Sequence, residues 1–253
     1  MSATDRQSSE RIFHDLQAQQ RAVTFDRRPE ALAFEDDAYL DHETWIRPAF
    51  MRLGEVGGLD ILDYGCGHAM AAVVLARRGA RLTAFDLSPG YLDEARRRAA
   101  ANEVGIDFVQ ADGERLPFAD GSFDRIWGNA VLHHLDVRIA GRELFRVLKP
   151  GGFALFCEPW GENPLLNWAR QGLPYPGKAR TPDEQPLRQR QVAVLREIFP
   201  SVGVTGCQLL AMARRVVKLG PVIDYLDRCD TMLLAQFPAL RRYCRYVILQ
   251  LQR

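Results

Sequence analysis

Apolar and polar positions alternate in short blocks through the middle of the chain. Apolar runs that end in a turn residue or a carboxylate are separated by stretches with apolar residues at helical spacing. The runs predict strands at 61–64, 81–86, 106–111, 122–127 and 152–156. Strands that alternate with helices in this way predict a parallel sheet, so we expect residues 57–157 to form one half of it.

The N-terminal region has a different pattern. Residues 1–56 are polar and acidic with scattered aromatic side chains, too few to form a core of their own. We therefore expect them to pack as a helical cap on the main domain. Pro48 is expected to interrupt or kink the second of these helices, because proline lacks the donor that a helix interior needs.

The C-terminal region begins with residues 158–186, which hold six of the fourteen prolines and three large aromatic residues, Trp160, Trp168 and Tyr175. So many prolines argue against regular structure, and a long loop of this kind is expected to cover a site. The aromatic residues either line a pocket or attach the cover to the sheet, and the sequence leaves both open. Further elements are expected as follows: a helix over 187–199, a strand over 202–217, an amphipathic helix over 220–235 and a closing strand over 243–250.

A glycine turn after the first predicted strand suggests a nucleoside site. Gly65 and Gly67 would let the backbone approach a ligand where a Cβ atom would collide with it. The next strand ends in Asp86, nineteen positions after Gly67, an offset that suits a carboxylate accepting hydrogen bonds from a ribose diol.

Two residues distinguish the expected ligand from a dinucleotide. Met70 stands where a dinucleotide fingerprint has its third glycine. Asp63, two residues before the turn, would repel a pyrophosphate but attract an ammonium group. The sequence therefore predicts a nucleoside ligand that carries a positive charge.

These residues resemble those of the class I S-adenosylmethionine (SAM)-dependent methyltransferases, whose first motif is D/E-x-G-x-G-x-G. Ala69 replaces the third glycine here. The resemblance extends to Asp112-Gly113, Leu116-Pro117-Phe118 and Lys149-Pro150-Gly151-Gly152 in the family's order. It implies a single domain over 1–253 with an α/β, Rossmann-like fold: a seven-stranded, mostly parallel sheet with helices on both faces, N-terminal helices and a lid insertion over 158–199 after the fifth strand. Strands with an inserted helix are expected over 200–253.

The resemblance also implies SAM as the cofactor and a set of contacts to it. Asp86 would bind the ribose, Asp112 the exocyclic amine of adenine, and the Gly113 backbone would lie against the ring. The complete set of expected cofactor-binding residues is Asp63, Gly65, Cys66, Gly67, Asp86, Leu87, Asp112, Gly113 and Asn129.

Three residues are candidates for catalysis: His133 and His134, which follow the fourth strand, and Glu158 at the end of the fifth. Imidazole has a pKa suited to taking a proton from an attacking hydroxyl. A structural role for one histidine, or a solvated carboxylate at Glu158, is the alternative. No metal is expected, because adjacent histidines diverge and the sequence brings no further ligand beside them.

Charge and cysteine content limit the partners. The 33 basic and 32 acidic residues nearly cancel, which gives no general attraction to nucleic acid. Five scattered cysteines without a CxxC pair suggest reduced thiols in a cytoplasmic protein, and no apolar run suggests insertion into a membrane.

The expected function is methyl transfer to a small molecule, apolar or aromatic, at oxygen or carbon. The [D/N]-P-P-[Y/F] sequence of nucleic-acid amino methyltransferases is missing, since Ala130-Val131-Leu132 follow Asn129. Two alternatives remain: a protein that uses SAM for a rearrangement without methylation, and an oxidoreductase that binds NAD on a similar sheet.

Overall fold

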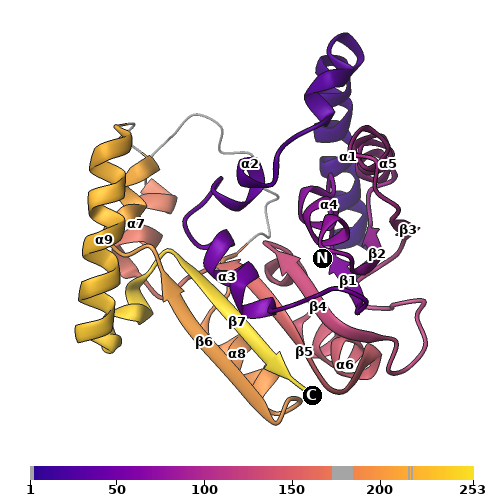
Figure 1. Cartoon of the computed structure of the whole chain (residues 1–253). Helices are drawn as coiled ribbons and strands as arrows, with labels where there is room; N and C mark the ends of the chain where they lie inside the picture. The colour runs from indigo at the N-terminus through magenta and orange to yellow at the C-terminus, as the bar shows by residue number, and fades with distance from the viewer. Residues whose placement is uncertain (1–2, 173–184, 216, 218) are drawn as a thin grey trace.

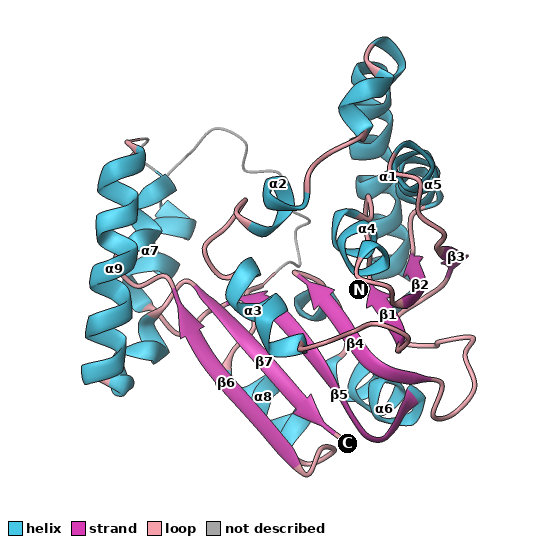
Figure 2. Ribbon diagram, viewed as in Figure 1, coloured by secondary structure: helices cyan, strands magenta, loops and turns pink. Residues whose placement is uncertain are grey.

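The computed structural model describes residues 3–172, 185–215, 217 and 219–253. They form a seven-stranded sheet in the order β3-β2-β1-β4-β5-β7-β6, in which β7 runs antiparallel to both of its neighbours (Figures 1 and 2). The strands are β1 (Asp60–Tyr64), β2 (Arg81–Asp86), β3 (Asp107–Gln110), β4 (Phe123–Asn129), β5 (Leu148–Pro159), β6 (Ser201–Cys207) and β7 (Tyr246–Gln252). The predicted fold class is confirmed.

Helices cover both faces of the sheet. One core is built around α3 and α4 and contains Phe50, Val74 and Trp127, while the other is built around α6 and α8 and contains Leu144, Leu195 and Phe156. The helices are α1 (Ala3–Arg27), α2 (Asp36–Leu40), α3 (Ile46–Leu53), α4 (Met70–Arg77), α5 (Pro89–Ala101), α6 (Val137–Val147), α7 (Pro164–Gly172), α8 (Gln189–Arg196) and α9 (Gly220–Gln236), with short 3-10 helices η1 (Pro29–Leu32), η2 (Leu132–His134), η3 (Ala211–Arg215) and η4 (Pro238–Tyr243).

The N-terminal helices pack on the main domain as expected. Helix α1 runs alongside α5, and α3 buries Ile46, Phe50 and Leu53 in the core (Figure 1). The prediction for Pro48 was wrong. Helix α3 begins at Ile46, so Pro48 lies in its first turn, where a backbone N–H has no hydrogen-bond acceptor within the helix and its absence costs nothing.

Three predictions for the C-terminal region need correction. Helix α7 lies within the stretch expected to be irregular, because Pro164 stands at its start, where proline is tolerated. Strand β6 ends at Cys207 instead of continuing to 217, and 3-10 helix η3 follows it. The closing strand runs over Tyr246–Gln252, three residues later than expected at its start. The inserted helix α9 is confirmed.

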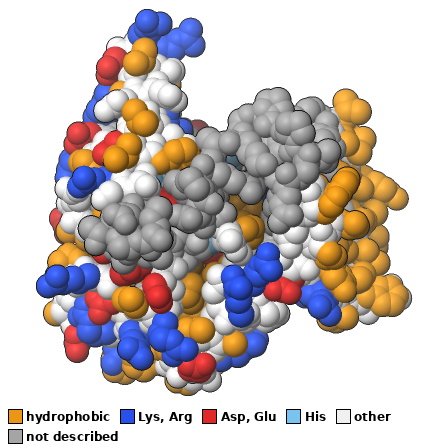
Figure 3. All heavy atoms as spheres, turned by 180° about the vertical axis from the view of Figure 1, so that it is seen from behind, with side chains coloured by type: hydrophobic (Ala, Val, Ile, Leu, Met, Phe, Trp, Pro, Cys, Tyr) orange, Lys and Arg blue, Asp and Glu red, His pale blue; other side chains and the backbone are white. Residues whose placement is uncertain are grey.

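Helices α7 and α9 form a lobe at the β6 end of the molecule (Figure 1). Figure 3, from behind, shows hydrophobic side chains gathered on this side. The large exposed apolar residues of the two helices and their flanks are Leu165, Trp168, Leu219, Val222, Tyr225, Met232 and Phe237. No helix among the described residues is both long and apolar enough to cross a membrane.

Candidate active site

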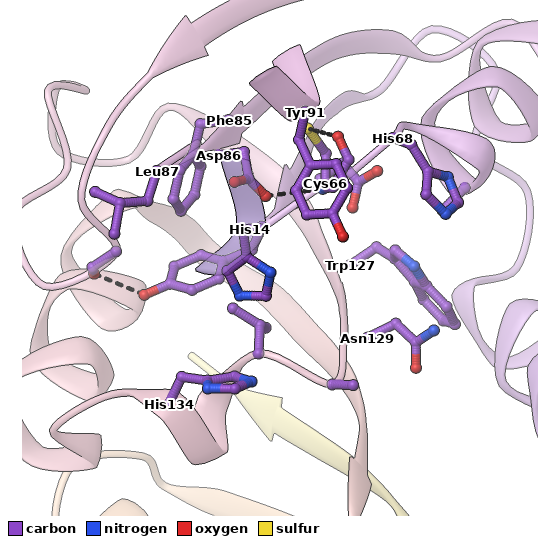
Figure 4. Close-up of a pocket in the computed structure, with 18 of the residues that line it drawn as sticks. His14, Cys66, His68, Phe85, Asp86, Leu87, Tyr91, Trp127, Asn129 and His134 are labelled. Atoms are coloured by element: carbon purple, nitrogen blue, oxygen red, sulfur yellow. Dashed lines mark hydrogen bonds between the residues drawn. The ribbon is translucent and has the colours of Figure 1, made fainter. Parts of the chain in front are cut away.

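A cavity of about 290 Å³ lies where the strands β1, β2 and β4 end. It is lined by all nine residues expected to bind the cofactor: Asp63, Gly65, Cys66, Gly67, Asp86, Leu87, Asp112, Gly113 and Asn129. Parallel strands bring their carboxyl ends to one edge of the sheet, so residues far apart in the sequence meet there. Figure 4 shows Asp86, Leu87, Trp127 and Asn129 directed toward this cavity.

The glycine turn between β1 and α4 has a backbone conformation that favours glycine. Gly65 and Gly67 both have positive φ, at 67° and 50°, and a Cβ atom on Gly67 would meet open space. A Cβ atom on Gly65 would lie 2.6 Å from Cγ2 of Val131. Ala69 also has positive φ, 61°, which explains why the family prefers glycine here.

Asp86 holds the turn in place through its carboxylate. Its Oδ2 accepts a hydrogen bond of 2.9 Å from the Gly67 backbone, and its Oδ1 accepts one of 2.9 Å from the Ser88 backbone. A carboxylate has about four acceptor positions, so two remain for a ligand's hydroxyl groups. Burial raises the pKa of Asp86 above its usual value, although these backbone donors oppose the rise.

Asp63 is the most unusual group in the cavity. Its side chain is buried, and Oδ2 accepts no hydrogen bond from any described residue. Burial, together with the charge of Asp86, raises the pKa of Asp63 to about 7. A buried carboxylate oxygen without a partner is costly unless a cationic group reaches it, so the site suits the α-amino group of an amino acid.

The turn after β3 is fixed by a residue of β1. The hydroxyl of Tyr64 donates a hydrogen bond of 2.6 Å to the carbonyl oxygen of Gly113. Asp112 Oδ1 accepts from the Glu114 backbone at 2.8 Å, which keeps the carboxylate within the turn. A flat ring could therefore lie against a backbone that is already in position.

The three catalytic candidates separate into two groups. Glu158 Oε1 accepts backbone hydrogen bonds from Val131 and Leu132, and its Oε2 lies 2.7 Å from Nδ1 of His133. Neither Glu158 nor His133 is among the described residues that line the cavity, whereas His134 is. The expectation that the two histidines diverge was wrong, because their ring centroids lie 4.1 Å apart. Of the two, only His134 lines the cavity, as Figure 4 shows.

The sequence reasoning missed a wall of the cavity that comes from the N-terminal helix. Glu10 and His14 of α1 line it, together with Tyr39 of α2 and Tyr91 of α5. Glu10 Oε1 lies 3.0 Å from Nδ1 of His134, and His14 Nε2 lies 3.4 Å from Glu10 Oε2. Burial alone would lower the pKa of His14, but the contact with Glu10 and the charge of Asp86 raise it. The spacing of four residues between Glu10 and His14 was the available signal.

The expected aromatic cover is only partly described. Trp160 is buried and donates from Nε1 to the carbonyl oxygen of Arg242, so it attaches β5 to η4 and does not line the cavity. Trp168 is exposed on α7, and Tyr175 lies outside the described residues.

Comparison with known proteins relates the central part of the chain to a known family. Residues 62–156 match the family described as "Methyltransferase domain". Over these residues the chain is similar to the class I SAM-dependent methyltransferases. SAM is the cofactor of this family, and the match favours it over NAD. One oxygen each of Asp63 and Asn129 is buried without a hydrogen-bond partner among the described residues, and these oxygens together with the open space at Gly67 fit the amino group and nucleoside of SAM.

Relatives and solved structures extend this likeness. The chain is 38% identical over 117 residues to a demethylmenaquinone methyltransferase of Clavibacter sepedonicus, covering 46% of this chain and 47% of that protein. It is 38% identical over 120 residues to a fatty-acid O-methyltransferase of Mycolicibacterium smegmatis, covering 46% and 43%. The chain thus spans less than half the length of these relatives. A SAM-dependent methyltransferase structure from Mesorhizobium loti, 23% identical, matches with a TM-score of 0.55 over 85% of this chain and 100% of that one, which shows the shared fold.

Proposed function

We propose that the protein transfers a methyl group from SAM to a small-molecule acceptor that is apolar or aromatic, at an oxygen or carbon atom. The observation that carries this proposal is the buried carboxylate of Asp63, whose Oδ2 has no hydrogen-bond partner among the described residues and which lies at the end of β1 in the same cavity as Asp86. A cavity with one site for a cation and one for a diol suits SAM better than a dinucleotide.

The residues of the chain would mainly bind SAM and orient it relative to the acceptor. Asp63 would hold the amino group, Asp86 the ribose, and Asp112 with the Gly113 backbone the adenine. The bound sulfonium supplies an electrophilic methyl group with a neutral leaving group, so alignment and exclusion of water provide most of the catalysis. The walls contributed by α1 and α2 help to exclude water.

Of the three catalytic candidates we retain His134 as the residue that faces the acceptor. A hydroxyl acceptor must lose a proton, and an imidazole next to the Glu10 carboxylate can assist that loss. We assign His133 and Glu158 to positioning, because Glu158 anchors the turn that carries His134 through two backbone hydrogen bonds.

The acceptor class is suggested by the relatives, whose names specify a demethylated menaquinone and fatty acids. We therefore propose an apolar acceptor bearing an oxygen or an activated ring carbon. The cavity includes apolar surface from Met70, Phe85, Val131 and Leu135, which suits such a molecule.

Two measurements test the proposal. Thermal shift and calorimetry should show tight binding of SAM and S-adenosylhomocysteine and none of NAD. Purified protein should then be incubated with methyl-labelled SAM and a panel of quinols, phenols and fatty acids, and methylated products followed by mass spectrometry, with Gly65→Val as the inactive control. Binding of SAM without any methylated product would favour the non-methylating alternative, and binding of NAD alone would overturn the proposal.

A further inference from the structure

Three side chains at the edge of the cavity bring together the ligands of a metal ion. Glu10 and His14 project from α1, and His134 from η2, more than a hundred residues later. One ligand atom from each of the three lies within 4.8 Å of the other two. We propose that Glu10, His14 and His134 bind a divalent transition-metal ion of the zinc class, at a site that opens into the cavity.

The distances within the cluster suit such an ion. Four ligands at zinc's usual distance in a tetrahedron lie about 3.3–3.4 Å from one another. His14 Nε2 lies 3.4 Å from Glu10 Oε2, and His134 Nδ1 lies 3.0 Å from Glu10 Oε1. The two histidine nitrogens therefore face the same carboxylate from two sides. One ligand nitrogen of His14 also lies within 4.8 Å of one of His134.

A neighbouring residue sets the tautomer that a metal requires. Nδ1 of His14 faces the side-chain oxygen of Gln17 at 3.4 Å, and the hydroxyl of Tyr91 donates to that same oxygen at 2.8 Å. With its oxygen toward the ring, Gln17 can only accept, so Nδ1 of His14 carries the hydrogen. In a neutral ring, Nε2 then has a lone pair available for a metal.

With that tautomer, His14 Nε2 and the Glu10 carboxylate would repel each other. The lone pair of Nε2 would face a carboxylate oxygen, an arrangement that needs a positive charge shared between the two atoms. Either a proton or a metal ion can supply that charge. With protons, His14 and His134 would each donate separately to Glu10, whereas a metal ion would bind all three residues at once.

The ligand set and its location indicate the class of ion. Two imidazoles and one carboxylate with an open position match a catalytic zinc-type site, whereas magnesium and calcium prefer oxygen ligands alone. The open position would take water or an oxygen atom of the acceptor. The ion goes beyond the proposed methyl transfer, and its binding can be measured without SAM or acceptor.

Binding of Co²⁺ and Zn²⁺ to chelator-treated, full-length protein tests the site. Tetrahedral Co²⁺ absorbs visible light, and Zn²⁺ should displace it with a stoichiometry of one. We expect His14→Ala and Glu10→Gln to weaken binding by at least about 100-fold, and Gln17→Ala by about 10-fold through loss of the oriented tautomer. His42→Ala is the matched control, since His42 is an exposed histidine outside the cavity and should leave binding unchanged.

The outcomes separate this inference from its alternatives. Circular dichroism checks that each variant is folded, and the near-isosteric Glu10→Gln keeps the test valid if His14→Ala loosens α1. If the wild type binds neither ion more tightly than His14→Ala, the shared cation is a proton and the metal site is refuted. A Co²⁺ spectrum with a thiolate charge-transfer band would place the ion on a cysteine and would refute it as well. Neither result would affect the proposed methyl transfer.

Discussion

Two walls of the same cavity are built in opposite ways. The strand-end wall consists of Asp63, Gly65, Gly67 and Asp86, which lie within 24 residues of one another in the sequence. Asp63 and Asp86 belong to two adjacent parallel strands, and the two glycines to the turn after the first of them. The α1 wall consists of Glu10 and His14, which reach the cavity only because α1 packs on α5. The first wall depends on the sheet itself, and the second on the docking of one peripheral helix.

The contacts that hold the α1 wall are polar. Asp15 Oδ1 accepts from Ser88 Oγ at 2.5 Å and from the Gly90 backbone at 3.2 Å, at the N-terminus of α5. Arg21 forms two hydrogen bonds, 2.8 and 3.0 Å long, with the carboxylate of Glu94. A helix held in this way can detach at much lower cost than a central strand can. We therefore expect substitutions in the strand-end wall to affect cofactor binding most.

The largest effect is expected for Gly65→Val. The valine would have to adopt a φ of 67°, and its Cβ would approach Val131 to 2.6 Å, so the turn proposed to bind the cofactor must move. We expect no SAM binding by calorimetry at millimolar concentrations. Gly54→Val is the matched control, because Gly54 has a similar φ of 70° but nothing within 4 Å of a Cβ, and lies outside the cavity. Wild-type affinity in Gly65→Val would mean that the turn is not the cradle.

The next effect is expected for Asp86→Ala. The substitution removes the carboxylate that would bind the ribose and that also holds the Gly67 backbone. Loss of such charge-assisted hydrogen bonds costs about 2–4 kcal/mol, or roughly 30- to 1000-fold in affinity for SAM. Asp93→Ala changes an exposed carboxylate on α5 and should leave the affinity unchanged. Equal affinities of the two variants would rule out the ribose contact.

A smaller effect is expected from pH, through Asp63. Since the pKa of Asp63 in the free protein is raised to about 7, the carboxyl group is protonated below that pH and ionised above it. An ammonium group prefers the ionised form, so SAM binding should release a proton, and affinity should fall about 10-fold per pH unit below 7. Calorimetry between pH 5.5 and 8 measures the slope. Asp63→Asn should bind SAM more weakly at pH 8 and lose most of the slope. Because His14 and Asp86 also face the cavity, a slope that persists in Asp63→Asn would assign the titration to one of them.

The same raised pKa has a consequence for stability. In the unfolded chain Asp63 would have its usual pKa near 3.8, so the folded, ligand-free protein binds the proton more tightly than the unfolded chain does. The stabilisation from this group is complete below about pH 4 and is lost as the pH rises through 7. Asp63→Asn should therefore raise the melting temperature of the ligand-free protein at pH 8 relative to the wild type.

Much of the strand-end wall could be predicted from the sequence. Gly65, Gly67 and Asp86 follow apolar runs directly, and the carboxyl ends of parallel strands must meet at one edge. Ser88 followed by Pro89 is a sequence typical of a helix start, and the Ser88 side chain accepts a hydrogen bond of 3.1 Å from the Tyr91 backbone. A residue that directly follows an apolar run therefore lies at the end of a strand, and the geometry of the parallel sheet brings these strand ends together.

The α1 wall and the separation of the two histidines could not be predicted in the same way. Whether His133 or His134 faces the cavity depends on the turn after β4, where Ala130 has a φ of 57° and Glu158 binds the backbone of the next two residues. That carboxylate comes from β5, and Glu10 comes from a helix that precedes the whole sheet. Such contacts depend on tertiary packing, and the four-residue spacing of Glu10 and His14 does not by itself show where α1 docks.

The smallest effect is expected for Asp15→Ala, which weakens the docking of the α1 wall. The variant loses the hydrogen bonds from Ser88 and Gly90, so α1 should detach more often, while Asp63 and Asp86 remain in place. We expect the affinity for SAM to fall by less than about 10-fold, roughly 1.4 kcal/mol, and amide exchange in residues 10–27 to become faster. Asp26→Ala is the matched control on the same helix, since Asp26 is largely exposed and pairs only with Arg97 at 2.9 Å among the contacts described for it. If Asp15→Ala weakened binding as much as Asp86→Ala, the two walls would contribute equally and the contrast between them would be wrong.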